Sequence, residues 1–204
     1  MHLIAENLTV HRGGEMVIDN ISFARSSGEA LIVRGENGSG KSTLLRAIAD
    51  LLPLESGGLT LSGRDPEFAD TPIPGLCHYL GHDNSMKPAL SVGENLTFWR
   101  EFAGFPHLDI GEALDVVGLA GLFDIPFAHL STGQRRRASI ARLLVSYRPI
   151  WLLDEPTSGL DAASEAQFCA LMQTHLDDEG IIIAATHVPL DISNASVLDL
   201  GVPR

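Results

Sequence analysis

The fold class of this chain is indicated first by residues 35–43, Gly35-Glu36-Asn37-Gly38-Ser39-Gly40-Lys41-Ser42-Thr43. This stretch matches the phosphate-loop pattern Gly-x-x-x-x-Gly-Lys-Ser/Thr, in which glycines let backbone N–H groups approach phosphate oxygens. An apolar run at 30–33 precedes the loop, and apolar residues at helical spacing follow it from 43 to 52, so the required strand and helix are both present. We therefore expect Lys41 to contact the β- and γ-phosphates of a nucleotide and Ser42 to ligate Mg²⁺.

A second informative stretch, Ile150-Trp151-Leu152-Leu153-Asp154-Glu155, is an apolar run that ends in two acids. Open α/β sheets bind their ligands at the carboxyl ends of the strands, where these acids would emerge. We expect Asp154 to hold Mg²⁺, directly or through water, and Glu155 to position or deprotonate the attacking water. Two acids after a strand also occur as a solvated turn, but beside a phosphate loop the catalytic interpretation is the stronger one.

Leu130-Ser131-Thr132-Gly133-Gln134 lies between these two stretches. By itself it is the start of a helix, with Ser131 or Thr132 as the N-cap. The interval from Gln134 to Asp154 has room for one helix and one strand. The order of the phosphate loop, residues 130–134 and the strand that ends in two acids indicates the protein family more specifically than any of the three alone.

This order of motifs resembles that of the ABC transporter ATPases. The resemblance implies a homodimer that sandwiches two ATP·Mg²⁺, each covered by the signature loop (Ser131, Thr132, Gly133 and Gln134) of the other subunit. Ser131 would donate to the γ-phosphate, assisted by the positive end of the following helix. The family usually has glycine where Thr132 stands.

The same resemblance assigns roles to four further positions. Asp161, in Ser158-Gly159-Leu160-Asp161, would shape the dimer contact, although it also fits an ordinary N-cap. His187, after the apolar run at 181–185, would contact the γ-phosphate, although such a histidine is usually only a polar surface residue. His82 stands where the family usually has a glutamine that holds the attacking water. His11 or Arg12 would stack on adenine.

The predicted fold class is α/β, a P-loop ABC-type ATPase with a mainly parallel sheet, an N-terminal antiparallel β portion and an inserted helical lobe. Residues 3–10 and 15–24 alternate around Gly13-Gly14, which predicts an antiparallel edge on the larger sheet. The whole chain, 1–204, is expected to be a single domain, with the helical lobe at roughly 91–147. Pro53 is expected to end the helix that follows the phosphate loop.

Composition limits the partners. The 204 residues carry a net charge of -12, which disfavours nucleic acid as a partner. Cys77 and Cys169 match no metal or redox spacing and are expected to be buried thiols in a reducing compartment. We expect no signal peptide, and the apolar runs are too short to span a bilayer, so any membrane part would come from another chain.

Several further segments of the sequence resemble one family among the ABC transporter ATPases. The resemblance rests on the segments Tyr79-Leu80-Gly81-His82, Met86–Val92 with Glu94-Asn95-Leu96, Gln134–Arg137 with Ala141–Ser146, Trp151–Thr157 and Ala185–Leu190. They are similar to the haem-export ATP-binding proteins of bacterial cytochrome c maturation, the CcmA family, in which histidine at the position of His82 is normal. The resemblance implies CcmB and CcmC membrane subunits, a place on the cytoplasmic face of the inner membrane, and ATP hydrolysis that energises haem export or release of the haem-loaded chaperone. Direct haem binding is not expected, since no Cys-x-x-Cys-His occurs.

Two alternatives stay open. The chain could serve another small transporter, with the same catalytic motifs and a different membrane partner. A soluble ABC ATPase that acts on nucleic acid or ribosomes is disfavoured by the single set of motifs and by the acidic charge. The run Arg135-Arg136-Arg137 fits either a solvated helix face or a contact of Arg135 with phosphate or with an acid of a partner.

Overall fold

Five strands form the sheet that carries the predicted site, in the order β5-β6-β7-β3-β8. Their bounds are β3 (Ala30–Arg34), β5 (Cys77–Leu80), β6 (Ile150–Asp154), β7 (Ile181–Ala185) and β8 (Ala195–Asp199). The pairs β3–β7, β3–β8 and β6–β7 are parallel. Every residue of β6 and β7 is buried, as expected for strands covered on both faces. The predicted mainly parallel sheet is confirmed.

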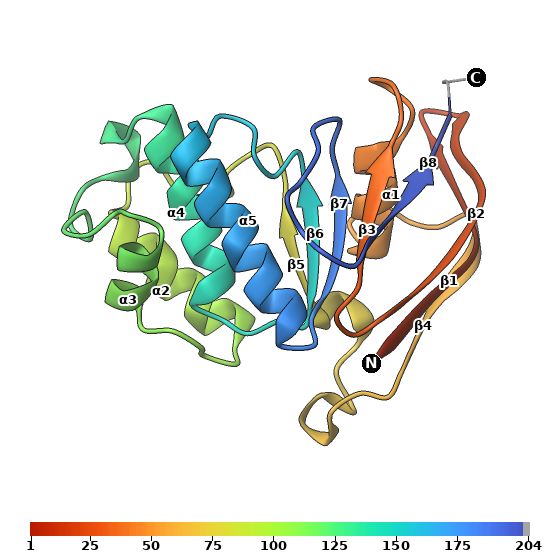
Figure 1. The fold of residues 1–204 in the computed structure, drawn as a ribbon, viewed down its shortest axis with the longest axis horizontal. Helices are drawn as coiled ribbons and strands as arrows, with labels where there is room; N and C mark the ends of the chain where they lie inside the picture. The colour runs from red at the N-terminus through yellow and green to blue at the C-terminus, as the bar shows by residue number, and fades with distance from the viewer. Residues whose placement is uncertain (202–204) are drawn as a thin grey trace. The chain divides into compact units, whose positions relative to one another are not determined.

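The computed structural model describes residues 1–201, and its contacts divide the chain into two units (Figure 1). The sheet unit comprises residues 1–79, 149–156 and 172–201, and the helical unit comprises residues 80–148 and 157–171. The organisation of 1–204 as one ATPase domain with a lobe at 91–147 stays a prediction, and its last three residues lie outside the described part.

Three antiparallel strands form a sheet of their own within the sheet unit. They are β1 (His2–Arg12), β2 (Glu15–Ser26) and β4 (Ser56–Ser62), in the order β2-β1-β4. The expectation that β1 and β2 form an edge of the larger sheet is wrong, because β1 pairs with β2 on one side and β4 on the other in a separate sheet. Gly13 and Gly14, both at positive φ, make the tight turn between β1 and β2.

Helix α1 (Lys41–Ile48) starts directly after the phosphate loop and ends before the predicted Leu52. Asp50 adopts a left-handed φ of 57°, and the N–H groups of Asp50 and Leu51 donate to the carbonyls of Ala47 and Arg46. These two hydrogen bonds form a Schellman motif, which satisfies the last helical carbonyls. The helix therefore ends before Pro53 could break it.

The helical unit contains α2 (Val92–Ala103), α3 (Ile110–Val116), α4 (Thr132–Leu144) and the first part of α5 (Ala162–Asp177). Helix α4 packs against α2 and α3, and Leu96, Leu114 and Ile140 are buried. Capping boxes start α2 at Ser91 and α3 at Asp109. Short 3-10 helices lie at Pro66–Phe68, Ile73–Leu76 and Phe127–His129. Within residues 1–201, no helix is long and apolar enough to cross a membrane.

Candidate nucleotide-binding and hydrolysis site

The phosphate loop connects β3 to α1 at the carboxyl end of β3. Gly35, Gly38 and Gly40 all have positive φ. A Cβ on Gly40 would lie 2.7 Å from Ile18 Cδ1 and 3.1 Å from the carbonyl oxygen of Val17, so no side chain fits there. The loop can therefore keep its backbone N–H groups close to a ligand, beside the positive end of α1.

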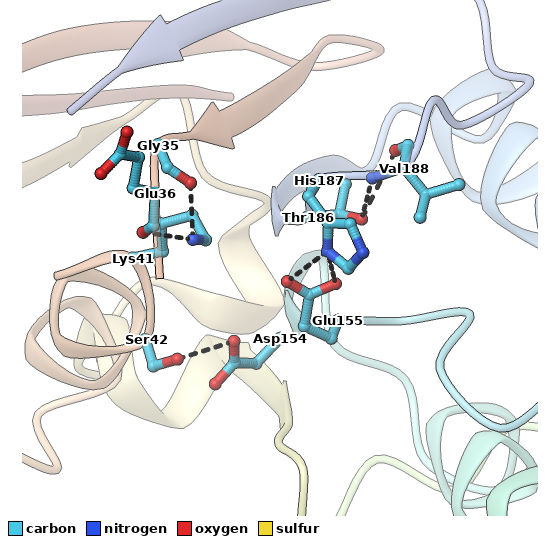
Figure 2. Close-up of polar contacts among 9 residues, drawn as sticks. All are labelled: Gly35, Glu36, Lys41, Ser42, Asp154, Glu155, Thr186, His187 and Val188. Carbon is cyan, nitrogen blue, oxygen red and sulfur yellow. Dashed lines mark hydrogen bonds and ion pairs between the residues drawn. The ribbon is translucent and has the colours of Figure 1, made fainter. Parts of the chain in front are cut away.

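Lys41 is the first residue of α1, and its side chain turns back over the loop (Figure 2). The ammonium group donates to the carbonyl oxygens of Gly35 at 2.8 Å and Glu36 at 3.0 Å. The side chain is 8 % exposed, so the positive charge lies within the loop and not in bulk water. From this position inside the phosphate loop, the Lys41 ammonium group can neutralise the charge of phosphate oxygens.

Asp154, the last residue of β6, reaches the phosphate loop. The Ser42 hydroxyl donates to Asp154 Oδ1 at 2.9 Å, although the two residues are 112 positions apart (Figure 2). Asp154 is 4 % exposed. The fold thus brings together the two residues that the sequence predicts as metal ligands.

The chemistry of this pair fits Mg²⁺. A hydroxyl and a carboxylate are hard oxygen donors, and Mg²⁺ in nucleotide sites is typically held by one or two such groups together with substrate phosphates and water. Lys41 and the backbone N–H groups of the loop can bind the phosphates next to this pair. Ser42 and Asp154 would hold the ion.

Two residues that the motifs did not identify form a chain of hydrogen bonds that ends on the same carboxylate. The Tyr79 hydroxyl, on β5, donates to Asp154 Oδ2 at 3.2 Å, and Arg46 Nε on α1 donates to the Tyr79 oxygen at 3.2 Å. Burial raises the pKa of Tyr79, the Asp154 charge raises it further and Arg46 opposes the change. The phenol therefore keeps its proton and acts as a donor. A tyrosine near the end of a half-buried strand was the only sequence signal for this contact.

Glu155 and His187 form the second polar contact of the site. His187 Nδ1 lies 3.1 Å from each of the two carboxylate oxygens of Glu155 (Figure 2). Glu155 has a left-handed φ of 45°, and its N–H donates to the carbonyl oxygen of Ala185 on β7. This link holds the strained residue beside the strand that leads to His187. The Glu155 side chain is 28 % exposed and that of His187 is 70 % exposed, so both are accessible from water.

A cavity of about 370 Å³ lies against the phosphate loop, Asp154 and Glu155. Its lining is Arg12, Val17, Asn37, Gly38, Gly40, Lys41, Ser42, Thr43, Asp154 and Glu155. Its volume is in the usual range for small-ligand sites. Of the two candidates for adenine stacking, Arg12 lines this cavity and His11 does not.

The signature residues lie in the helical unit and interact mainly with one another. Ser131 Oγ accepts from the N–H of Gln134 at 3.2 Å, and the Gln134 side chain accepts from the N–H of Ser131 at 2.9 Å. This capping box starts α4. Ser131 is exposed, and a Cβ added to Gly133 would lie 3.5 Å from the carbonyl oxygen of Gly159. The signature and Asp161-containing loops therefore lie side by side.

Asp161 starts α5 by accepting from the N–H of Ser164 at 2.8 Å. This hydrogen bond, which stabilises the carboxylate, lowers the pKa of Asp161. His82 is exposed, and the segment that carries it is tied to α4: Arg136 Nη1 donates to the carbonyl oxygen of Gly81 at 2.7 Å. Ser139 Oγ completes this tie by donating to Asn84.

The three consecutive arginines are not one solvated face. Arg136 is only 5 % exposed. Arg135 donates to the carbonyl oxygen of Ala128, and Arg137 donates to that of Gly118. Each guanidinium binds backbone oxygens within the helical unit, so these arginines connect α4 to its neighbouring loops.

Comparison with known proteins agrees with this geometry. Residues 18–158 match the family model of the ABC transporter. The cytochrome c biogenesis ATP-binding export protein CcmA of Chelativorans sp. is 57% identical over 98% of this chain and 98% of its own length. The protein of the same name from Mesorhizobium japonicum is 58% identical over 99% of both chains. A solved ABC transporter ATP-binding protein of Pyrococcus furiosus superposes with a TM-score of 0.82 at 24% identity, over 98% of each chain, which supports the fold.

The phosphate loop, the acid pair, the signature loop and these full-length similarities lead to one assignment. This chain belongs to the CcmA family of ABC transporter ATP-binding proteins, and it is an ATP-hydrolysing, transport-coupled enzyme.

Proposed function

We propose that this chain is the ATP-hydrolysing subunit of a membrane complex for haem delivery in cytochrome c maturation. The observation that carries the ATPase part is the Ser42–Asp154 hydrogen bond, which joins the phosphate loop to the acidic strand end. The assignment to cytochrome c maturation is supported by the similarity to two proteins named for cytochrome c biogenesis and export.

The proposed reaction uses the residues of the sheet unit in sequence. Lys41 and the loop amides bind the β- and γ-phosphates, and Arg12 stacks on the adenine. Mg²⁺ held by Ser42 and Asp154 would neutralise the charge that develops on the phosphate oxygens. Glu155 accepts a proton from the attacking water as the water approaches the γ-phosphate in line with the leaving oxygen.

His187 would connect Glu155 to the γ-phosphate. Its Nδ1 already lies on the Glu155 carboxylate, which leaves Nε2 on the opposite edge of the ring. We propose that Nδ1 stays on Glu155 while Nε2 faces a γ-phosphate oxygen when ATP is bound.

The second half of each site would come from another copy of the chain. Ser131 is exposed at the positive end of α4, and among residues 1–201 its side-chain oxygen hydrogen-bonds only to the local N–H of Gln134. A γ-phosphate held by the partner copy would offer this helix end the charge that it favours. We therefore propose a homodimer with two ATP, in which Asp161 shapes the contact between copies.

The helical unit also offers a surface for the membrane subunits. Phe98 and Phe102 on α2 are 43 % and 72 % exposed, and their rings stack at 5.7 Å. Exposed aromatic pairs of this kind commonly mark protein interaction sites. We propose that CcmB- and CcmC-like subunits dock here and beside His82, with the chain on the cytoplasmic face of the bacterial inner membrane. Haem itself would be handled by those partners.

A pull-down from detergent-solubilised native membranes tests this function. Tagged Glu155→Gln protein with Mg²⁺·ATP is the bait, and co-purifying chains are identified by mass spectrometry. We expect haem-handling membrane subunits and a haem-bearing chaperone. A different permease would preserve the ATPase and overturn the haem assignment, and recovery of no membrane protein would favour a soluble ABC ATPase.

Matched variants of the bait test the docking surface. Phe102→Asp should reduce recovery of the membrane subunits, because it places a charge on the exposed aromatic pair. Leu51→Asp is the control, since Leu51 is also exposed (58 %) but lies in the sheet unit. Equal recovery with both variants would place the docking surface elsewhere.

A further inference from the structure

The carboxylate of Asp154 is held from two sides by different elements. Ser42, in the first turn of α1, donates to Oδ1, and Tyr79, on β5, donates to Oδ2. Strand β5 is the neighbour of β6 in the sheet, so the tyrosine belongs to the rigid framework of the site and not to a loop. Each oxygen of this carboxylate therefore has its own hydrogen-bond donor.

The second donor has a mechanical consequence. The terminal torsion of an aspartate side chain is broad, because rotation about an sp³–sp² bond has no deep staggered wells. A single hydrogen bond from Ser42 leaves the carboxylate plane free to turn about that contact. The Tyr79 hydroxyl on Oδ2 limits this rotation and keeps Oδ1 directed toward the phosphate loop.

Arg46 determines which way the phenol proton points. Its Nε donates to the Tyr79 oxygen, so the phenol acts as an acceptor on that side and its single proton is available for Asp154. Ser42 and Arg46 are four residues apart on α1 and thus lie on one face of the helix. The helix that begins at the phosphate loop therefore contributes to both ends of the same chain of hydrogen bonds.

We propose that Tyr79 is a positioning residue for the Mg²⁺-binding carboxylate, and that Arg46 orients its hydroxyl. This inference rests on the proposed role of Asp154 as a metal ligand. Partners behind a ligand fix its orientation and tune its affinity for metal without touching the metal themselves. Tyr79 should therefore affect the response to Mg²⁺ and leave metal-free nucleotide binding unchanged.

Titrations with a fluorescent ATP analogue test this proposal. Tyr79→Phe keeps the ring and removes only the hydroxyl. We expect its affinity for the analogue in EDTA to match the wild type, while the Mg²⁺ concentration for half-maximal effect rises about 3- to 10-fold, at or below the lower end of typical effects of such partners because phosphates also hold the ion. Arg46→Lys should give a smaller increase in the same direction, since it keeps the charge and loses Nε.

Two control variants separate the possible failures. Tyr147→Phe changes the only other tyrosine of the chain and lies in the helical unit, so it should titrate as the wild type. Asp154→Asn should lose most of the Mg²⁺ response. If Asp154→Asn is impaired and Tyr79→Phe is not, the Tyr79 proposal is wrong. If neither variant changes the Mg²⁺ response, the metal role of Asp154 itself is wrong.

A spectroscopic measurement adds a readout that does not depend on affinity. With two tyrosines, 3-fluorotyrosine labelling should give two ¹⁹F resonances, and Tyr147→Phe assigns them. Addition of Mg²⁺ to protein saturated with a non-hydrolysable ATP analogue should shift the Tyr79 resonance and leave that of Tyr147 in place. A Tyr79 resonance that does not respond to Mg²⁺ would overturn the proposal.

Discussion

The phosphate loop and the signature loop are both glycine-containing starts of helices, but their side chains are held in opposite ways. In the sheet unit, Ser42 reaches Asp154 across 112 positions, and Tyr79 reaches it across 75. In the helical unit, Ser131 and Gln134 cap each other across 3 positions. One loop is part of a site assembled from distant segments, and the other is complete as local structure.

The two loops should therefore differ in what they can do without a second copy of the chain. The Lys41, Ser42 and Asp154 group has its protein contacts within one chain, so a monomer should already bind nucleotide. Ser131 is exposed and caps α4, and within residues 1–201 its side chain makes no hydrogen bond that a catalytic role would need. A second copy of the chain supplies that contact in the proposed dimer.

The largest expected effect is that of Lys41→Ala on ATP turnover. Loss of the ammonium group from the phosphate loop removes a charge that stabilises the transition state, so turnover should fall by about 100-fold or more. Lys87→Ala is the control, because Lys87 is the only other lysine and lies over the Phe98 ring in the helical unit. Steady-state phosphate release measures both, and full activity of Lys41→Ala would refute the loop assignment.

Glu155→Gln should separate binding from hydrolysis. The amide cannot accept the proton of water, so turnover should fall by about 100-fold while ATP stays bound. Light scattering after gel filtration with Mg²⁺·ATP should then show a dimer. Glu165→Gln, on α5, provides the control for a changed carboxylate elsewhere. A Glu155→Gln protein that stays monomeric under these conditions would count against the sandwich.

Ser131→Ala tests whether the signature loop is more than a cap. It should cost about 1 kcal/mol of folding stability through loss of the N-cap. It should also lower turnover about 10-fold, with nucleotide binding by the monomer unchanged. Ser91→Ala removes the cap of a similar capping box on α2 and should lose similar stability with full turnover. Equal turnover in the two variants would reduce Ser131 to a structural residue.

Thr132→Gly is expected to have the smallest effect. The substitution introduces the glycine that is usual at this position in the superfamily. Thr132 Cγ2 is close to Gly159, since a Cβ added to Gly159 would lie 3.8 Å from it. Loss of the side chain should cost less than about 0.5 kcal/mol in the helix and change turnover by less than about threefold. Thermal melting and phosphate release measure the two quantities. A large gain in turnover would show that Thr132 limits the approach of the two copies.

Several errors of the sequence-based predictions have physical causes. The early strands were assigned to an edge of the larger sheet because their alternation does not indicate which strands they pair with. Helix α1 was extended to Leu52 because a proline was expected to end it, but the left-handed Asp50 ends it earlier. Arg136 looked like one of three surface arginines, whereas it is buried and bound to the carbonyl oxygen of Gly81.

The sequence by itself determined the local chemistry: the glycine positions of the phosphate loop, the cap at Ser131, the acids after β6 and the membership in one family. These follow from residue type and short spacing, which act through backbone geometry and neighbouring groups. The hydrogen bonds from Arg46 to Tyr79 and from Tyr79 to Asp154, and the contact of His187 with Glu155, depend on the tertiary structure. Such contacts join segments that are far apart in the chain. The order of the strands in the sheet determines which of these residues meet, and no local sequence pattern specifies that order.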